Sequence, residues 1–163
     1  MRIIIVFVLL SALFFSCDNK SCENVVCQGA HSTCVDGDCY CLPGYEGDFC
    51  DELSYLKYEG SYQVFEQCTT TFSGFVTQQF SSSINGGFEI DILTINNFAN
   101  RGLPVDATIV SANFLTITSQ NVGSVQVSGG EGTYEVFANR IHFEYNYTVG
   151  SNFHQCIADF TRF

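Results

Sequence analysis

Basic residues are scarce in this chain. Only 6 of the 163 residues are Lys or Arg, against 17 Asp or Glu, and the formal net charge at pH 7 is −11. A surface with this charge repels the phosphate backbone of nucleic acids and the head groups of anionic lipids. The composition therefore argues against a partner made of DNA or RNA.

Helical periodicity and recognisable catalytic motifs are also missing. No segment repeats its apolar residues at the spacing of an amphipathic helix, and neither a G-x-S-x-G elbow nor a glycine-rich phosphate loop occurs. The three histidines, His31, His142 and His154, lie in separate segments without the spacing of a metal site, so we interpret them as ordinary surface or half-buried histidines. A hairpin of residues 141–149 and 153–160 around residues 150–151 would place His154 opposite Tyr147 and not opposite His142. We therefore predict no catalytic residue, no metal site and no cofactor, and expect a protein that is not an enzyme.

Long hydrophobic runs are confined to the first residues. Met1 and Arg2 precede an apolar run over residues 3–15. A helix of this length spans about 20 Å, which is shorter than the bilayer core of about 30 Å. The pattern predicts a secretory signal peptide over residues 1–16, with a buried helix of the mature domain as the alternative. Its removal leaves 5 basic and 17 acidic residues, a net charge of −12.

Cysteine, in contrast, is abundant, and its count of 9 is odd. Such density in an exported chain predicts an oxidising compartment and disulfide bonds. Cys17 directly follows the apolar run, and the small residue Ser16 before it resembles the lipobox of bacterial lipoproteins. This resemblance implies that acyl chains on Cys17 anchor the protein in a membrane. The alternative is a free or intermolecularly bonded thiol at Cys17.

The residues after Cys17 are polar and include Asp18, Asn19 and Lys20. We expect them to form a tether over residues 17–21, which resembles the surface-export tethers of Bacteroidetes lipoproteins. The resemblance implies a location on the surface of the bacterial outer membrane. Secretion into the extracellular space is the alternative location.

Six cysteines between residues 22 and 50 follow one another with gaps of four, six, four, one and eight residues. Spacing alone leaves fifteen pairings open. With the turn residues Pro43, Gly44, Tyr45 and Gly47, the segment 22–51 resembles an EGF-like domain. The resemblance implies the disulfides Cys22–Cys34, Cys27–Cys39 and Cys41–Cys50. We expect Gly44 and Gly47 to adopt backbone angles that a side chain disfavours, and Tyr45 to pack over the last disulfide.

Metal ions are alternatives that this cysteine-rich segment leaves open. Zinc is the less favoured, because thiolate sites belong mainly to reducing compartments and the one-residue gap between Cys39 and Cys41 is tight for a zinc site. Calcium is the other, since Asp36 and Asp38 offer hard oxygen ligands. The segment has no room for the longer calcium-binding consensus, so we expect a solvated acidic surface at these residues.

From residue 53 onward the composition changes to one typical of β-strands, and Pro104 is the one proline of this region. Strands are predicted over residues 58–68, 74–80, 88–95, 105–110, 114–118, 122–127, 133–138, 141–149 and 153–160, with a tight turn at residues 85–87. The strict alternation over residues 141–149 predicts a sheet with one buried and one wet face. Residues 53–163 are therefore predicted to form an antiparallel β-barrel or sandwich of about eight strands, so the whole protein is mostly β.

The two remaining cysteines, Cys68 and Cys156, lie in the first and last predicted strands. A bridge between them would join these strands, as closing a barrel requires. Gly60 and Tyr62 resemble the G-x-W opening of lipocalin-like barrels, and the region resembles the small lipocalin-like domains of Bacteroidetes lipoproteins. Large inward aromatic residues such as Phe143 and Tyr145 favour an interior filled by side chains over a ligand cavity.

The predicted role is binding rather than turnover. We expect an exported, lipid-anchored cell-surface protein that binds a protein, a glycan or a small apolar ligand. One alternative is a barrel-type enzyme that uses scattered carboxylates, of which Glu89 and Asp91 are expected on one strand face. The other is a secreted eukaryotic EGF-domain ligand or matrix protein, in which the sequon beginning at Asn146 would carry a glycan.

Overall fold

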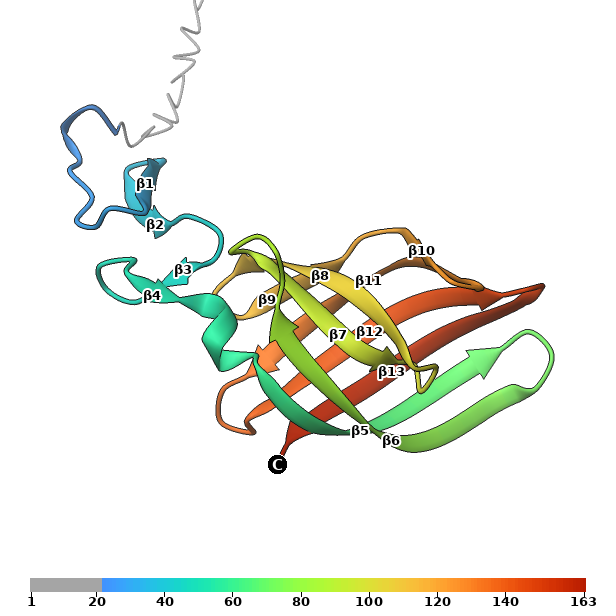
Figure 1. The fold of residues 1–163 in the computed structure, drawn as a ribbon. Helices are drawn as coiled ribbons and strands as arrows, with labels where there is room; N and C mark the ends of the chain where they lie inside the picture. The colour runs from blue at the N-terminus through green and yellow to red at the C-terminus, as the bar shows by residue number, and fades with distance from the viewer. Residues whose placement is uncertain (1–21) are drawn as a thin grey trace, which may run out of the picture.

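The computed structural model describes residues 22–163 (Figure 1). The predicted signal peptide, the predicted lipid anchor Cys17 and the predicted tether lie outside the described residues. The structure consists of a small N-terminal module followed by a β-barrel, and it contains no α-helix within residues 22–163. No helix of the described part is long and apolar enough to cross a membrane.

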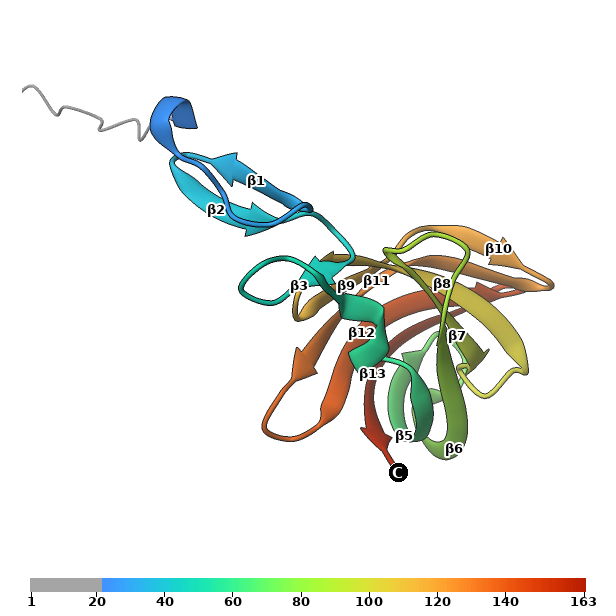
Figure 2. The ribbon, with the colours of Figure 1, turned by 60° about the vertical axis from the view of Figure 1, so that its left-hand side comes forward.

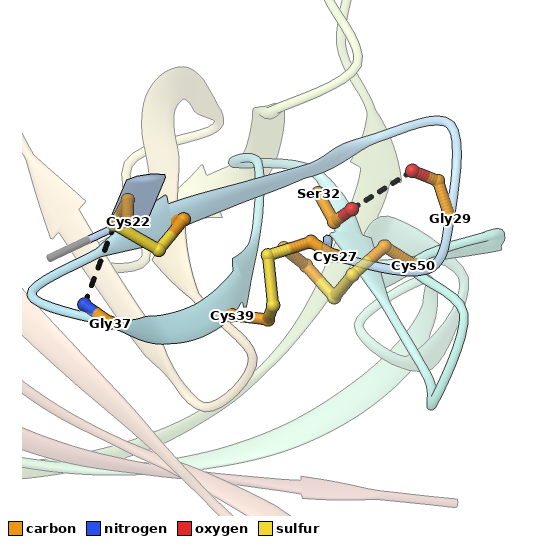
Figure 3. The surroundings of a disulfide bond; sticks show 9 residues. Cys22, Cys27, Gly29, Ser32, Gly37, Cys39 and Cys50 are labelled. Carbon is orange, nitrogen blue, oxygen red and sulfur yellow. Dashed lines mark hydrogen bonds between the residues drawn. A yellow bond between two sulfur atoms is a disulfide. The ribbon is translucent and has the colours of Figure 1, made fainter. Parts of the chain in front are cut away.

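The N-terminal module contains little regular structure. Its elements are η1 (Cys22–Asn24), β1 (Ser32–Val35), β2 (Asp38–Cys41), β3 (Tyr45–Glu46) and β4 (Glu52–Leu53), and η2 (Ser54–Lys57) leads into the barrel. β1 and β2 form a hairpin around Asp36 and Gly37, which both have positive φ. Three disulfides join Cys22 to Cys34, Cys27 to Cys39 and Cys41 to Cys50 (Figure 3). These are the pairs that the EGF resemblance implies.

Crosslinks replace a hydrophobic core in this module. Within residues 22–53 the buried class contains only Gly44 and Cys50, and Cys50 is the one buried hydrophobic residue there. A segment of about thirty residues cannot bury enough apolar surface to offset its chain entropy, so disulfides must constrain it. Local hydrogen bonds add to them, from Gly37 N to Cys22 Sγ and from Ser32 Oγ to the carbonyl of Gly29 (Figure 3).

The barrel is an antiparallel meander. Its strands are β5 (Gly60–Thr70), β6 (Gly74–Gly86), β7 (Ile92–Phe98), β8 (Leu103–Ser111), β9 (Phe114–Ile117), β10 (Gln120–Val122), β11 (Val125–Glu135), β12 (Arg140–Val149) and β13 (Asn152–Arg162). β9 and β10 both pair with β11 in one register, with Ile117 opposite Gly130 and Gln120 opposite Val127, and so act as one interrupted strand. Pairing of β13 with β5 closes the ring, which makes an eight-stranded barrel and not a sandwich.

Side chains alternate between the interior and solvent along each strand, as a closed barrel requires. The interior is packed with large side chains, among which the bulkiest fully buried ones are Tyr58, Tyr62, Tyr145, Tyr147, Phe98, Phe143 and Phe160. The rings of Phe98 on β7 and Tyr145 on β12 meet across the barrel with centroids 4.5 Å apart, and those of Phe143 and Phe160 meet between the neighbouring strands β12 and β13 at 5.0 Å. Aromatic rings therefore fill the middle of the barrel.

Two local predictions are wrong. Residues 85–87 do not form the tight turn, because Asn85 and Gly86 still pair with Thr94 and Leu93 at the end of β6. The chain reverses over residues 87–91 instead, and a hydrogen bond from Gly87 N to the carbonyl of Ile92 closes that loop at 2.7 Å. Glu89 and Asp91 consequently lie in a loop and not on a strand face.

The second correction concerns β11, in place of which the sequence pattern predicts two separate strands over 122–127 and 133–138. One strand runs through the glycine-rich stretch between them, and residues 136–138 belong to the following turn. The glycines are needed inside the strand because a Cβ on Gly132 would lie 2.3 Å from the ring of Phe143, and one on Gly130 would lie 2.6 Å from Cβ of Tyr145. Glycine here provides room for aromatic rings of β12.

The barrel has two different ends. The proximal end carries the N-terminal module, the start of β5 and the end of β13 (Figures 1 and 2). The distal end consists of the loops 71–73, 99–102, 123–124 and 150–151. An ion pair between Lys57 and Glu46 and a 2.9 Å hydrogen bond from Ser54 N to the carbonyl of Gly44 join module and barrel at the proximal end.

Side chains around η2 close the proximal end. The hydroxyl of the buried Tyr58 donates to the carbonyl of Ala112 at 2.9 Å. Arg162, at the end of β13, donates to the carbonyls of Lys57 and Glu59, and its guanidinium lies 5.7 Å from the ring centroid of Tyr62. The distal end has no such cover within the described residues, and the site described next lies there.

Candidate functional site

A hollow of about 220 Å³ opens at the distal end of the barrel. We call it the mouth pocket, and its polar lining includes Glu66, Thr70, Gln78, Arg101, Tyr147 and His154. The inward positions of the strands change character toward this end. On β5 they run from Tyr62 and Val64 to Glu66 and Thr70, and on β13 from Phe160 and Ala158 to Cys156 and His154. The barrel interior is thus apolar at its centre and polar at its distal mouth.

Glu66 lies at the base of the mouth pocket with 0 % of its surface exposed. Gln78 Nε2 donates to one carboxylate oxygen and the hydroxyl of Tyr145 donates to the other. These bonds offset the cost of removing a charge from water, which would otherwise amount to several kcal/mol. Burial, reinforced by the neighbouring Glu66, raises the pKa of Tyr145 well above its ordinary value, so Tyr145 stays a neutral donor.

His154 and Tyr147 form one wall of the mouth pocket. They are cross-strand partners on β13 and β12, and their rings stack with centroids 4.3 Å apart and planes 8° apart. On the rim, the guanidinium carbon of Arg101 lies 5.2 Å from the ring centroid of Tyr147. Burial raises the pKa of Tyr147, and a hydrogen bond with Arg101 opposes that rise.

His154 is largely covered by the pocket wall. Only 9 % of its surface is exposed, and no hydrogen bond joins either ring nitrogen to another residue within residues 22–163. Burial lowers the pKa of His154 below its ordinary value, and the positive charge of Arg101 lowers it further. The imidazole is therefore neutral at pH 7 and presents one donor and one acceptor. The side-chain atoms buried without a hydrogen-bond partner in the described residues are Ser54 Oγ and Arg162 Nε, so the ring nitrogens of His154 still reach solvent through the mouth pocket and can bond to water or to a ligand there.

The disulfide Cys68–Cys156 lies beside Glu66. The two cysteines are directly opposite each other on β5 and β13, with Cα atoms 4.1 Å apart, and their sulfurs are within 4.8 Å of a carboxylate oxygen of Glu66. Both sulfurs are bonded to each other, so the group presents no thiolate to a metal. The bridge instead fixes the two strands that carry Glu66 and His154.

The residues expected to be functional from the sequence lie elsewhere. Gly44 and Gly47 have φ of +87° and +86°, as predicted, and belong to the N-terminal module near the proximal end. The ring of Tyr45 stacks on His31 with centroids 3.7 Å apart, a partner that the sequence did not suggest. Pro43 precedes this turn, and Asp36 and Asp38 flank Gly37 in the β1–β2 hairpin.

Sequence reasoning missed the mouth pocket. The sequence predicts His154 opposite Tyr147, and the register confirms this, yet the same reasoning treats His154 as an ordinary surface or half-buried histidine. The signal that could have found the pocket is the alternation of inward and outward side chains along the strands. Glu66 falls on the same face as Val64 and Cys68, and His154 on the same face as Cys156 and Ala158, so both are placed among core residues. A charged or titratable residue on a core face indicates a satisfied network or a site.

Comparison with protein-family models, with curated proteins and with solved structures finds no match for this chain. The functional argument therefore depends on the geometry of the chain itself.

Proposed function

We propose that this is an exported protein, held at the outer surface of a bacterial membrane by acyl chains on Cys17, whose barrel binds a small polar molecule in the mouth pocket. The N-terminal module, in this proposal an EGF-like spacer, separates the barrel from the membrane. The binding is proposed to be reversible and without chemical conversion.

The observation that carries the proposal is the polar lining of the mouth pocket, in which the largely covered imidazole of His154 makes no hydrogen bond to another residue within residues 22–163. The proximal end is closed by Tyr58 and Arg162, so ligand access is through the distal mouth. The filled interior argues against a ligand held in the middle of the barrel, and thereby against the small apolar ligand that the sequence left open. A polar ligand at the mouth agrees with the lining.

Binding is favoured over catalysis by the state of the carboxylate. Glu66 is the one carboxylate in the pocket lining, both of its oxygens accept hydrogen bonds, and it has no exposed surface. A general base or nucleophile has to reach its substrate at hydrogen-bond distance. Glu89 and Asp91, the carboxylates considered for an enzyme, lie in the 87–91 loop at the opposite end of the barrel.

Two experiments test the proposal separately. For the anchor, the mature protein is purified from a bacterial host and its N-terminal peptide is analysed by mass spectrometry. We expect acyl chains on Cys17. The same protein is also expressed in a eukaryotic host, where an unmodified N-terminus together with a glycan at Asn146 would favour the secreted alternative.

For binding, the mature chain carrying Cys17→Ser is screened against small polar metabolites by NMR. The backbone amide signals around the mouth pocket are the readout in every variant, and the ring signals of His154 are followed as well wherever that residue is present. We expect at least one saturable response that disappears in His154→Phe. The matched control is His142→Phe, on the outer surface of β12, which should leave the response intact. A screen in which no compound moves the His154 signals would contradict a binding role for the mouth pocket.

A further inference from the structure

The charges around the mouth pocket indicate what kind of molecule it takes. Residues 22–163 contain four basic side chains: Lys57, Arg101, Arg140 and Arg162. Lys57 pairs with Glu46, Arg140 pairs with Glu135 and Asp159, and Arg162 donates to two main-chain carbonyls. Arg101 has neither a carboxylate nor a carbonyl partner within this range, and it lies over the ring of Tyr147 and hydrogen-bonds to the hydroxyl of that residue.

A guanidinium without a carboxylate partner is unusual in so acidic a chain, where the acids outnumber the bases 17 to 6. Arg101 is exposed at the rim of the mouth pocket and keeps most of its five N–H donors free for a ligand. Its planar fork binds a carboxylate through two parallel hydrogen bonds, which are charge-assisted and stronger than bonds between neutral groups. The rim therefore offers a site for an anion.

The second contact is His154, deeper in the pocket. Its unpartnered ring can donate one hydrogen bond and accept another, so it suits a hydroxyl, an amino group or the second oxygen of the anion. Arg101 and His154 both line the mouth pocket and both contact Tyr147, Arg101 at 5.2 Å and the His154 ring at 4.3 Å from its ring centroid, so they are close enough to engage one small molecule. A ligand anion would partly cancel the charge of Arg101.

The buried carboxylate of Glu66 sets an upper limit on the charge of the ligand. Glu66 has no exposed surface, so it acts on a bound molecule through its field and not through contact. That field opposes each additional negative charge in the pocket, which disfavours a phosphate relative to a carboxylate. The volume of about 220 Å³ lies below the range of about 300–1,000 Å³ typical for drug-sized ligands, so the molecule is small.

We propose that the mouth pocket selects small molecules with a single carboxylate and a second polar group, the carboxylate bound by Arg101 and the polar group by His154. This inference rests on the proposed binding function and names the ligand class for it. The neighbouring charged or titratable groups that face His154 are Arg101 from the β7–β8 loop, Glu66 from β5 and Tyr147 from β12.

The test uses three probes of similar size with the mature chain carrying Cys17→Ser: lactate, glycerol and inorganic phosphate. Affinities are measured by NMR titration of the His154 ring signals. We expect lactate to give a saturable response, to bind at least 10-fold more tightly than phosphate, and to raise the pKa of His154 because a nearby anion favours the imidazolium.

Two arginine variants separate a specific contact from general charge. Arg101→Gln should weaken lactate binding at least 10-fold. Arg140→Gln removes the same charge from the outer wall of the barrel and should change the affinity less than 2-fold. Equal thermal melting of Arg101→Gln and the parent protein shows that the fold is intact.

Three results would overturn the inference. A glycerol response that requires His154, without a lactate response, excludes the carboxylate but leaves the binding function standing. Tighter binding of phosphate than of lactate excludes the single-charge limit. Absence of any response to all three probes at tens of millimolar overturns the proposed ligand class, and the wider metabolite screen then decides whether the pocket binds anything.

Discussion

At the scale of single residues, Glu66 shows how this protein tolerates a charge in its interior. It is the one Asp or Glu in the buried class among residues 22–163. Its two donors come from different strands, Gln78 from β6 and Tyr145 from β12. The arrangement makes the donors, and not the carboxylate alone, important for stability.

We predict that Tyr145→Phe lowers the free energy of unfolding by about 1–3 kcal/mol, because one oxygen of the buried Glu66 loses its donor while the ring packing is kept. Urea denaturation followed by circular dichroism measures the change. Tyr134→Phe is the control, since the hydroxyl of Tyr134 donates to the exposed Asn139 and its loss should cost less than about 0.5 kcal/mol. Equal losses in the two variants would contradict this account.

His154 makes stability depend on pH. Its pKa in the folded protein lies below the ordinary value of 6.5, so the unfolded chain binds a proton first as the pH falls. The contribution of neutral His154 is fully present above pH 6.5 and is lost as the pH falls through the folded pKa. We predict that the urea concentration at the unfolding midpoint decreases as the pH is lowered from 7 to 5. His154→Gln should make this decrease with pH smaller. Gln155→Ala, at the adjacent outward position, should keep the parental decrease.

At the scale of elements, alternation of side chains was sufficient to predict most of the barrel. The inward and outward faces of β12 and its pairing with β13 around residues 150–151 are as predicted. The extent of β11 was not predictable, because its glycines are explained by rings of β12 that are distant in sequence. The mouth pocket was missed for the same reason, since Glu66, Gln78, Arg101 and His154 come from four separate segments and meet only through the closure of the barrel.

The glycines of β11 give a test at this scale. We predict that Gly132→Ala destabilises the barrel by about 1–3 kcal/mol, because the new methyl group overlaps the ring of Phe143. Gly150→Asn is the comparison, since Gly150 lies in a hairpin turn with φ of +60°, a Cβ added there would have no atom within 4 Å, and asparagine tolerates that conformation. Urea midpoints that shift equally would show that ring space does not explain the glycine at 132.

At the scale of the whole molecule, the disulfides divide into two kinds. The three in the N-terminal module close short loops, with sequence separations of 9 to 12, whereas Cys68–Cys156 spans 88 positions. In the chain-entropy treatment, the long loop stabilises by about 4.5 kcal/mol and a nine-residue loop by about 2.5 kcal/mol. The long-range bridge should therefore contribute more to stability than any single bridge of the module.

We predict that replacing Cys68 and Cys156 together by alanine lowers the urea midpoint of the barrel markedly. Replacing Cys41 and Cys50 together should leave the midpoint of the barrel close to that of the parent, because these residues lie in the N-terminal module. Tyrosine fluorescence reports on the barrel interior, where Tyr62, Tyr145 and Tyr147 are buried. A larger effect from the Cys41/Cys50 variant would mean that the barrel depends on the module for its stability.

The pairing of β5 with β13 also governs how the protein is made. One edge of β5 cannot pair until β13 has been synthesised, because the partners of residues 62–70 on that edge are residues 154–162. Until synthesis reaches the end of the chain, β5 has an open edge that can recruit a strand from another molecule. Chains whose synthesis ends before β13 are therefore expected to associate through the unpaired edge of β5 and to aggregate, and not to form a smaller barrel.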